Sequence, residues 1–241
     1  MSGTVGPRPE SIFNRFSFEF DGTDDYVDCG NGASLQITGE LSISAWVKTS
    51  DNRDAIIVSK DDQTNRSYAF WANVAGGGAN YTSLYVFSSG SATGVVSNTL
   101  LTSGTWNHVM GVFKPSTYMR IYLNGVLDAE ITTSIPSSID NDPANLLIGK
   151  GLLAGYNFYG NIDEVAIWNT DQSANITSIY NQGVTNDIST LNPISWWRMG
   201  DKATYSNPGG VGNWTLVDQG SGGNDGTSNG MDENNRVLDT P

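Results

Sequence analysis

The sequence has very little sulfur and imidazole chemistry, with one cysteine (Cys29) and one histidine (His108) in 241 residues. A single cysteine excludes an internal disulfide, so no oxidising compartment is implied. Zinc needs several cysteine or histidine ligands and is excluded. A Ser-His-Asp or Cys-His catalytic site would have to use His108, which lies beside Trp106 in a predicted strand. A hydrogen-bonded structural histidine is the simpler interpretation.

Positive charge is also scarce: 12 Lys and Arg stand against 25 Asp and Glu, a formal net charge of −13. Nucleic acid is therefore excluded as a partner, because its binding depends on basic contacts to phosphate. The same charge disfavours anionic membranes, and no apolar run is long enough to span one. The first residues lack the basic and apolar regions of a signal peptide, so we expect a protein made in the cytoplasm and not exported by that route.

Proline is sparse (8 residues) and glycine abundant (28), the composition of short strands joined by tight turns. One short helix is predicted at about 173–182, with Ser173 or Asp171 capping its start and Gly183 ending it. Asn124-Gly125 indicates a two-residue hairpin with Gly125 at positive φ. The fold class is all-β, two-sheet and antiparallel. The predicted strands cover 16–20, 26–29, 41–48, 55–59, 67–74, 82–87, 106–113, 118–123, 126–131, 145–149, 158–168, 194–199 and 214–217.

The chain divides into an extended N-terminal arm, residues 1–15, and a single domain, residues 16–241. The arm holds Pro7 and Pro9, which favour an extended backbone without ladder hydrogen bonds. At the other end, residues 194–241 contain tryptophans that need a core to bury them. We therefore expect this tail to complete the same sandwich.

Five segments, in order along residues 18–168, resemble the laminin-G-like family of the concanavalin A-like jelly-roll superfamily. They are FEFDGTDDYV from Phe18, LSISAWV from Leu41, GTWNHV from Gly104, IYLNG from Ile121 and GNIDEV from Gly160. Each motif alone is weak, but five in the expected order are specific. The resemblance implies a jelly-roll sandwich in which Trp46, His108, Asn124 and Gly125 are structural.

A further pair of motifs stands in an unusual place. The family often carries a W-R-x-G-D … N-D-G-T segment before its first strand, whereas here it comes last, as Trp197-Arg198-Met199-Gly200-Asp201 and Asn224-Asp225-Gly226-Thr227. Circular permutation is the simplest explanation, because sandwich termini lie close together. A truncated second copy is the alternative, but it would leave Trp196, Trp197 and Trp214 without a core.

Some related sandwiches are glycoside hydrolases, which need two carboxyl groups about 5 Å apart when they retain configuration. No two glutamates of this sequence share a predicted strand. Asp163 and Glu164 are adjacent, so strict alternation would point them to opposite faces. We therefore predict no catalytic residues.

Calcium needs only oxygen ligands. Alternation places Asp163 on the inward face of Val165 and Ile167, and the resemblance brings the acidic turn of the first strand close to it. One structural Ca²⁺ is the resulting hypothesis, and a carboxylate of Asp163 that caps backbone N–H groups of the turn is the alternative. The candidate ligands are Asp21, Asp24, Asp25 and Asp163.

A sugar site needs an aromatic platform with amide or carboxylate partners. Aromatic residues in strands are more often part of a core, so two interpretations stay open for Tyr68, Trp71 and Tyr85. The candidate ligand-binding residues are Asn65, Tyr68, Trp71, Asn80 and Tyr81.

Three functions are compatible with these observations. The first is a non-catalytic component of a tailed-phage virion surface, either a capsid decoration or a tail or fibre protein. The closing motif resembles those of laminin-G-like proteins found among phage structural proteins. Its partners would be other virion proteins, a surface glycan or further copies of the chain. The second is a free-standing carbohydrate-binding lectin or adhesin at a cell surface, and the third a glycoside hydrolase.

Overall fold

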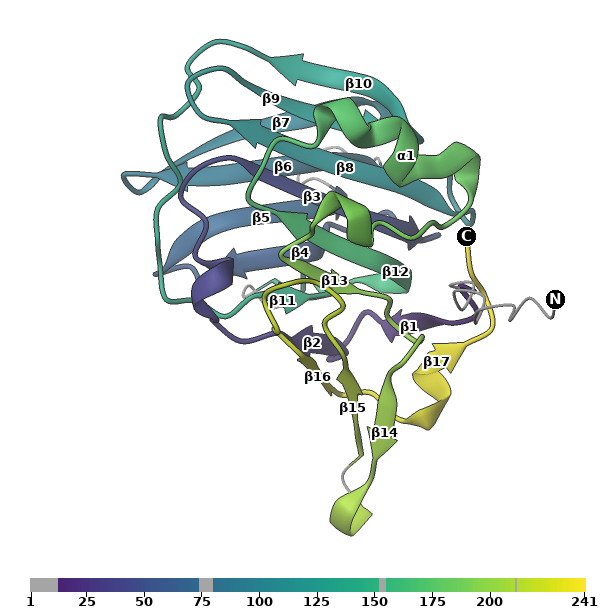
Figure 1. Cartoon of the computed structure of the whole chain (residues 1–241). Helices are drawn as coiled ribbons and strands as arrows, with labels where there is room; N and C mark the ends of the chain where they lie inside the picture. The colour runs from purple at the N-terminus through teal and green to yellow at the C-terminus, as the bar shows by residue number, and fades with distance from the viewer. Residues whose placement is uncertain (1–12, 74–79, 152–154, 211) are drawn as a thin grey trace, which may run out of the picture.

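The computed structural model describes residues 13–73, 80–151, 155–210 and 212–241. It contains two antiparallel sheets packed face to face, with one short helix, α1 (Ile176–Tyr180), lying over the outer face of one of them (Figure 1). The predicted all-β sandwich with a short helix is confirmed. Within the described residues, no helix is long and apolar enough to cross a membrane.

The helix-covered sheet has eight strands in the order β10-β9-β8-β3-β12-β1-β17, with β13 paired to β12. Its centre is built from apolar strands buried on both faces, since α1 covers one face and the second sheet the other. The bounds are β1 Ser17–Asp21, β3 Leu41–Lys48, β8 Asn107–Lys114, β9 Tyr118–Leu123, β10 Val126–Ile131, β12 Tyr159–Trp168, β13 Ser195–Trp197 and β17 Arg236–Val237.

The second sheet has nine strands in the order β14-β15-β16-β2-β11-β4-β5-β6-β7. Its inner face packs on the first sheet, and β7 forms one edge. The bounds are β2 Tyr26–Asp28, β4 Ala55–Asp61, β5 Arg66–Asn73, β6 Tyr81–Ser88, β7 Ser91–Leu100, β11 Leu147–Ile148, β14 Thr204–Ser206, β15 Asn213–Leu216 and β16 Gly226–Asn229.

The C-terminal residues 194–241 contribute strands to both sheets. β13 pairs with β12, β16 with β2, and β17 with β1. Trp197 and Trp214 lie in the main hydrophobic core, and Trp196 joins a smaller cluster beneath α1. The tail therefore contributes strands to both sheets and side chains to the core.

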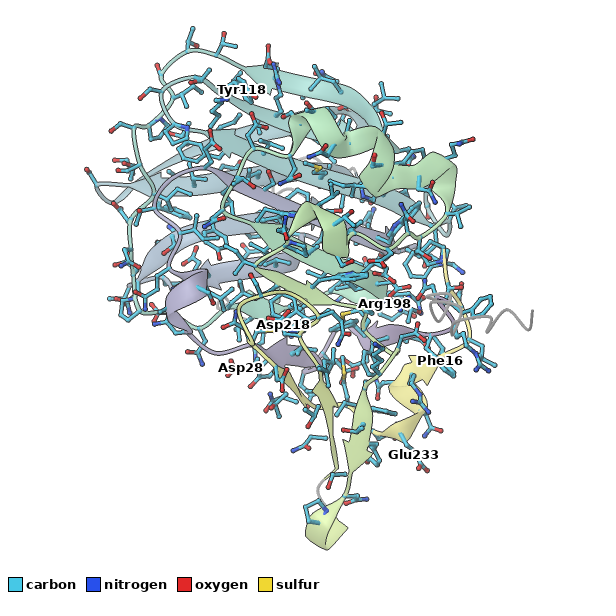
Figure 2. The ribbon with its side chains drawn as sticks, viewed as in Figure 1. Phe16, Asp28, Tyr118, Arg198, Asp218 and Glu233 are labelled. Carbon is cyan, nitrogen blue, oxygen red and sulfur yellow. The ribbon has the colours of Figure 1, made fainter. Side chains whose placement is uncertain are left out.

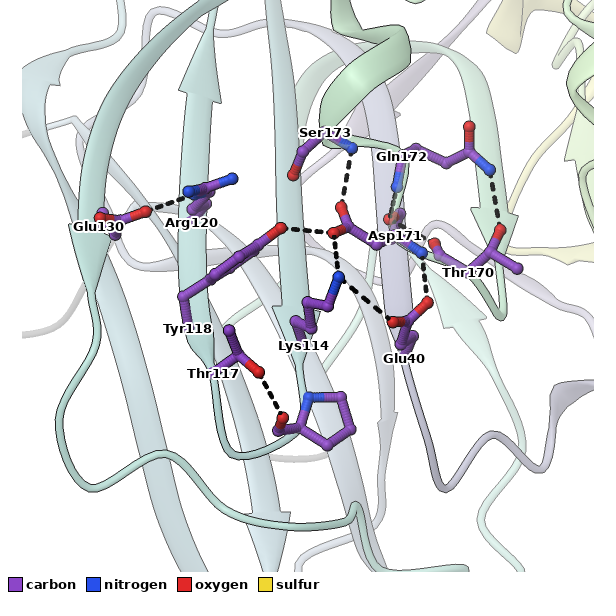
Figure 3. A network of polar contacts seen from close by, with 12 residues as sticks. Glu40, Lys114, Thr117, Tyr118, Arg120, Glu130, Thr170, Asp171, Gln172 and Ser173 are labelled. Carbon is purple, nitrogen blue, oxygen red and sulfur yellow. Dashed lines mark hydrogen bonds and ion pairs between the residues drawn. The ribbon is translucent and has the colours of Figure 1, made fainter.

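Polar side chains fix the approach to α1. The Asp171 carboxylate accepts a hydrogen bond from the Ser173 backbone N–H at 2.9 Å and lies 3.3 Å from Lys114 Nζ, which also approaches Glu40 at 3.7 Å (Figure 3). Of the two predicted caps, Asp171 makes the hydrogen bond at the start of this region, while α1 itself has Asn175 at its N-cap without a side-chain cap. The predicted end was wrong: α1 ends at Tyr180, followed by Asn181 at φ 45°, and Gly183 comes later.

The β9–β10 hairpin has the predicted turn. Asn124 has φ 48° and Gly125 φ 79°, and a type I′ turn requires positive φ at both positions. The Asn124 Oδ1 accepts a hydrogen bond from the His108 backbone N–H at 2.9 Å. The side chains of Trp46 and Tyr180 stack beside it, with ring centroids 5.8 Å apart. These residues hold strands and helix together, as the resemblance implied.

Candidate functional site

Large aromatic side chains lie on the outer face of the nine-stranded sheet, the face directed away from the core. Phe70 and Leu84 are core residues, so alternation directs Trp71 of β5 and Tyr81 and Tyr85 of β6 outward. All three rings are partly exposed. Trp71 stands directly across from Ser83, which places Trp71 diagonally between the two tyrosines.

Two contacts position these rings. The Tyr85 ring covers its β7 neighbour Gly94, where an added Cβ would meet the Tyr85 Cε1 atom at 2.3 Å. The Trp71 ring meets Tyr156 edge-on, with ring centroids 5.1 Å apart. Tyr156 belongs to the segment between β11 and β12, and its carbonyl accepts a hydrogen bond from the Ile56 backbone N–H at 3.1 Å. We call Trp71, Tyr81, Tyr85 and Tyr156 the aromatic face.

The floor of the aromatic face consists of small side chains. Ala69 is 1% exposed and Ser83 is 0% exposed, although both belong to the outward-directed set. The Ser83 Oγ has no hydrogen-bond partner within the described part of the chain. The aromatic face is therefore a partly exposed aromatic surface over a floor of small side chains.

The structure brings together some of the predicted ligand-binding residues and separates others. Trp71 and Tyr81 belong to the aromatic face, and Asn80 directly precedes Tyr81 in the chain. The expectation for Tyr68 is corrected: its ring is fully buried in the core, and its hydroxyl donates to the Leu35 carbonyl at 3.5 Å. Asn65 lies in the β4–β5 turn, where its amide donates to Asp62 at 2.8 Å, roughly 20 Å of strand from Trp71.

The acidic turn after β1 keeps three of the four predicted calcium ligands together. Carboxylate oxygens of Asp21, Asp24 and Asp25 lie within 4.8 Å of one another. The Asp21 Oδ1 accepts the Thr23 N–H at 2.7 Å, and the Asp25 Oδ2 accepts the Asp21 N–H at 3.0 Å. Burial raises the pKa of Asp25 to about 6. These carboxylates cap the turn, and calcium binding there stays a prediction.

Asp163 is not part of that turn. The register of β1 on β12 pairs Asp21 with Tyr159, whereas Asp163 faces Trp46 of β3. The Asp163 Oδ2 accepts a hydrogen bond from the Asn14 amide at 2.7 Å, and Oδ1 accepts one from the Glu164 N–H at 2.8 Å. Asp163 therefore accepts a backbone hydrogen bond within its own strand, from the Glu164 N–H, and not from the turn after β1.

A β-bulge corrects the predicted facing of Asp163 and Glu164. The register on β3 shifts between Asp163 and Ala166, and Glu164 has φ 49°. Ile162 and Val165 both lie in the main core, so the two acids between them share the outer face beneath α1. Strict alternation predicted opposite faces, because a sequence pattern does not show an inserted residue.

Both acids are sealed from solvent. Asp163 is 0% and Glu164 6% exposed. The Glu164 carboxylate accepts hydrogen bonds from Trp196 Nε1 at 2.6 Å and Arg198 Nε at 3.0 Å (Arg198 is labelled in Figure 2). Burial raises the pKa of both carboxyl groups, that of Glu164 to about 7. The adjoining cavity, lined by Ser44, Trp46, His108 and Glu164 among others, measures about 10 Å³, which is space for one water.

The motif Trp197-Arg198 … Asn224-Asp225 supplies residues whose role sequence reasoning did not assign. Asp218 accepts hydrogen bonds from the N–H groups of Trp196 and Asn224, each at 2.8 Å. The Asn224 carbonyl accepts one from Trp197 Nε1 at 2.8 Å. The motif therefore ties the C-terminal loop to β13, a structural role.

The family assignment rests on the sequence of the central region. Residues 21–175, more than half of the chain, match Laminin_G_3, described as the concanavalin A-like lectin/glucanases superfamily. The chain belongs to this family. No curated protein matches it. Within this family the five segments from Phe18 to Val165 are structural motifs, as their positions in both sheets indicate.

Solved structures share the fold at low identity. One is a Bacteroides ovatus protein described as carbohydrate-binding, with a TM-score of 0.67 and 17% sequence identity. The match covers 96% of this chain and 64% of the Bacteroides chain. The heptameric SAP-like pentraxin of Limulus polyphemus gives 0.54 at 13%, covering 69% and 82%. Domain 4 of the extracellular arabinanase AbnA from Geobacillus stearothermophilus, in complex with arabinotriose, gives 0.52 at 19%, covering 75% and 79%.

Proposed function

We propose that this chain is a non-catalytic glycan-binding module and that the aromatic face is its binding surface. One observation carries the proposal: Trp71, Tyr81 and Tyr85 lie partly exposed on the outer face of the sheet, and contacts with Tyr156 and Gly94 position the rings of Trp71 and Tyr85. Aromatic side chains offer large, rigid contact areas, and sugar rings present C–H groups that stack on them. The arabinotriose complex of a structural neighbour is consistent with this proposal.

The acid pair Asp163 and Glu164 is unsuited to glycoside hydrolysis. A retaining glycosidase needs two carboxyl groups that flank the scissile bond. Asp163 and Glu164 share a face, but both are buried. The Asp163 carboxylate is hydrogen-bonded to Asn14, and that of Glu164 to Trp196 and Arg198. A cavity of about 10 Å³ admits no sugar ring. The pair therefore serves packing and strand alignment.

The test of this proposal is a glycan array probed with purified protein. We expect binding to at least one glycan class, and we expect Trp71→Ala to lower the affinity at least tenfold. Tyr159→Ala is the matched control, because Tyr159 is a 45% exposed aromatic outside the aromatic face. Equal loss in both variants, or no binding to any glycan, would contradict the proposal.

We further propose that the module acts on the surface of a tailed-phage virion, as a capsid decoration or a tail or fibre protein. The support is the closing Trp-Arg-Met-Gly-Asp motif, the acidic surface and the N-terminal arm, of which residues 1–12 lie outside the described residues. Mass spectrometry of purified particles should find the protein at fixed stoichiometry. Glycan binding without any particle association would favour the free-standing lectin or adhesin instead.

A further inference from the structure

The strands that carry the aromatic face contain no Asp, Glu, Lys or Arg beyond Arg66, the first residue of β5. Between Arg66 and Lys114 the sequence has no Asp, Glu, Lys or Arg, although the chain has a net charge of −13. This interval includes β6, β7 and all of β5 after its first residue. The segment that supplies Tyr156 is also uncharged from Gly151 to Ile162. Arg66 itself is used at the far end of the sheet, where it pairs with Asp61 at 2.8 Å and covers the Phe87 ring at 3.9 Å.

The rings are arranged across the strands. One cross-strand row contains Trp71, Ser83 and Val96, and the next contains Ala69, Tyr85 and Gly94. Tyr156 continues the platform toward β4, and the Tyr85 ring continues it over β7. Three strand spacings of about 4.8 Å give the platform a length of roughly 14 Å. This length exceeds one sugar ring.

We propose that the aromatic face selects uncharged oligosaccharides and rejects glycans that carry carboxylate or sulfate. The inference rests on the proposed glycan-binding function and adds the substrate class. An anionic sugar needs a basic partner when it leaves water. The only basic residue of the three strands is Arg66, which is already paired with Asp61 at the far end of the sheet. The net negative charge of the chain adds long-range repulsion. A neutral sugar needs only ring stacking and hydroxyl hydrogen bonds, which Trp71, Tyr81 and Tyr85 can supply.

The experiment compares matched pairs of glycans on the array, neutral against sialylated or sulfated on the same core. We expect every bound glycan to be uncharged and its anionic counterpart to bind at least tenfold more weakly. We also expect the dissociation constant of the best neutral oligosaccharide to change less than twofold between about 0.05 and 0.5 M NaCl, because charge pairing would weaken over this range. Its monosaccharide should bind more weakly.

A gain-of-function variant makes the test independent of folding defects. Val96 is 39% exposed on the same face, so Val96→Lys places one positive charge beside the platform, and Val96→Ala is its control. The lysine variant should improve anionic binding at least threefold and leave neutral binding unchanged. If anionic glycans bind wild type better and Trp71→Ala abolishes that binding, the charge inference is wrong while the glycan function stands. If no glycan binds, both are wrong.

Discussion

Glu164 and Arg198 form a buried ion pair, with the Nε and Oε1 atoms 3.0 Å apart and side chains 7% and 5% exposed. The pair joins β12 to the residue after β13, and the Trp196 indole N–H donates a hydrogen bond to the second carboxylate oxygen of Glu164. Glu164 reaches this position because the bulge holds it at φ 49°. The tail thus attaches to the sandwich through a polar contact as well as through its tryptophans.

Replacing Arg198 should expose the energetic cost of this pair. Arg198→Met leaves a buried carboxylate without its cation, so we expect the free energy of unfolding to fall by about 3–5 kcal/mol. The double variant Glu164→Gln with Arg198→Met should lose less, because no charge remains buried. Urea denaturation measures both. Arg120→Met, which breaks the more exposed pair with Glu130, is the control and should cost about 1 kcal/mol or less. Equal losses at both sites would contradict the assignment.

His108 should make stability depend on pH. Its ring is fully buried beside the Ser44 hydroxyl, 2.8 Å from Nε2, and burial lowers its pKa from 6.5 to about 3. Below pH 6.5 the unfolded chain takes up a proton that the native ring refuses, so stability falls as pH falls toward 3. Between pH 7 and 4.5 this group should cost about 2–3 kcal/mol.

The measurement is the difference in unfolding free energy between pH 7 and 4.5 for wild type and His108→Gln. The variant lacks this contribution. Lowering the pH from 7 to 4.5 should therefore cost the variant about 2–3 kcal/mol less unfolding free energy than it costs wild type. Asp25 and Glu164 act in the opposite direction, because their raised pKa values, about 6 and 7, add stability as pH falls. Both remain in the variant and cancel. Parallel pH profiles would show that the native ring accepts the proton.

Sequence patterns predicted most of this architecture, and the failures have physical causes. The strand 118–123 and its partner 126–131 agree with the structure to the residue, because Asn-Gly determines the turn between them. β7 was missed since SATGVVSNTL is small and polar, and only its pairing with β6 makes it a strand. The bulge at Glu164 was missed for a related reason. Strand pairing decided both: the β6–β7 hairpin with Ser88 opposite Ser91 made β7 a strand, and the register of β12 on β3 produced the bulge.

The aromatic face likewise could be predicted from the sequence only in part. The sequence nominated Tyr68, Trp71 and Tyr81 together. In the fold, Trp71 and Tyr81 are partly exposed on the outer face, whereas the alternation of β5 directs Tyr68 into the core. Tyr156 had no signal, since it precedes β12 in a loop and meets Trp71 only through tertiary structure. The sequence can nominate aromatic residues for a site, and the fold decides which of them share it.

Gly125 should be intolerant of a side chain. Its φ is 79°, and a Cβ there would meet the Tyr180 ring at 2.4 Å. Gly125→Val should therefore lower the free energy of unfolding by roughly 1–3 kcal/mol from backbone strain, with the ring clash adding to it. Gly39→Val is the matched control, because no atom lies within 4 Å of its added Cβ. A thermal melt that ranks the two equally would contradict the hairpin geometry.

The calcium hypothesis has a sharper test now that Asp163 lies apart from the turn. Millimolar Ca²⁺ added after EDTA treatment should raise the melting temperature, since a ligand specific to the native state adds about 1.4 kcal/mol at ten times its Kd. Asp24→Asn should reduce this response, because Asp24 belongs to the acidic group. Asp163→Asn should leave it unchanged. No shift in wild type would mean that the turn carboxylates act as caps alone.

The last prediction concerns the boundary between arm and sandwich. Asn14 donates to the buried Asp163 at 2.7 Å, and the N–H groups of Arg15 and Phe16 donate to Asp201 at 2.9 and 3.3 Å. These bonds attach residues 14 and 15 to the sandwich, although the sequence placed both in the arm. A chain that starts at Phe13 should therefore melt like the full-length protein, whereas a chain that starts at Phe16 should lose about 1–3 kcal/mol through the unpaired Asp163.

The two truncations also separate stability from assembly. Residues 1–12 contain only Met1, Val5 and Ile12 as large apolar groups, too few to offset an ordering cost of roughly 1–2 kcal/mol per residue without a partner. A strap that pairs with an edge strand of a neighbouring subunit would meet that cost on binding. The chain starting at Phe13 should then keep its melting temperature but lose incorporation into particles or self-association, measured by particle pull-down and light scattering. Normal assembly of this shortened chain would refute the strap and favour the lectin.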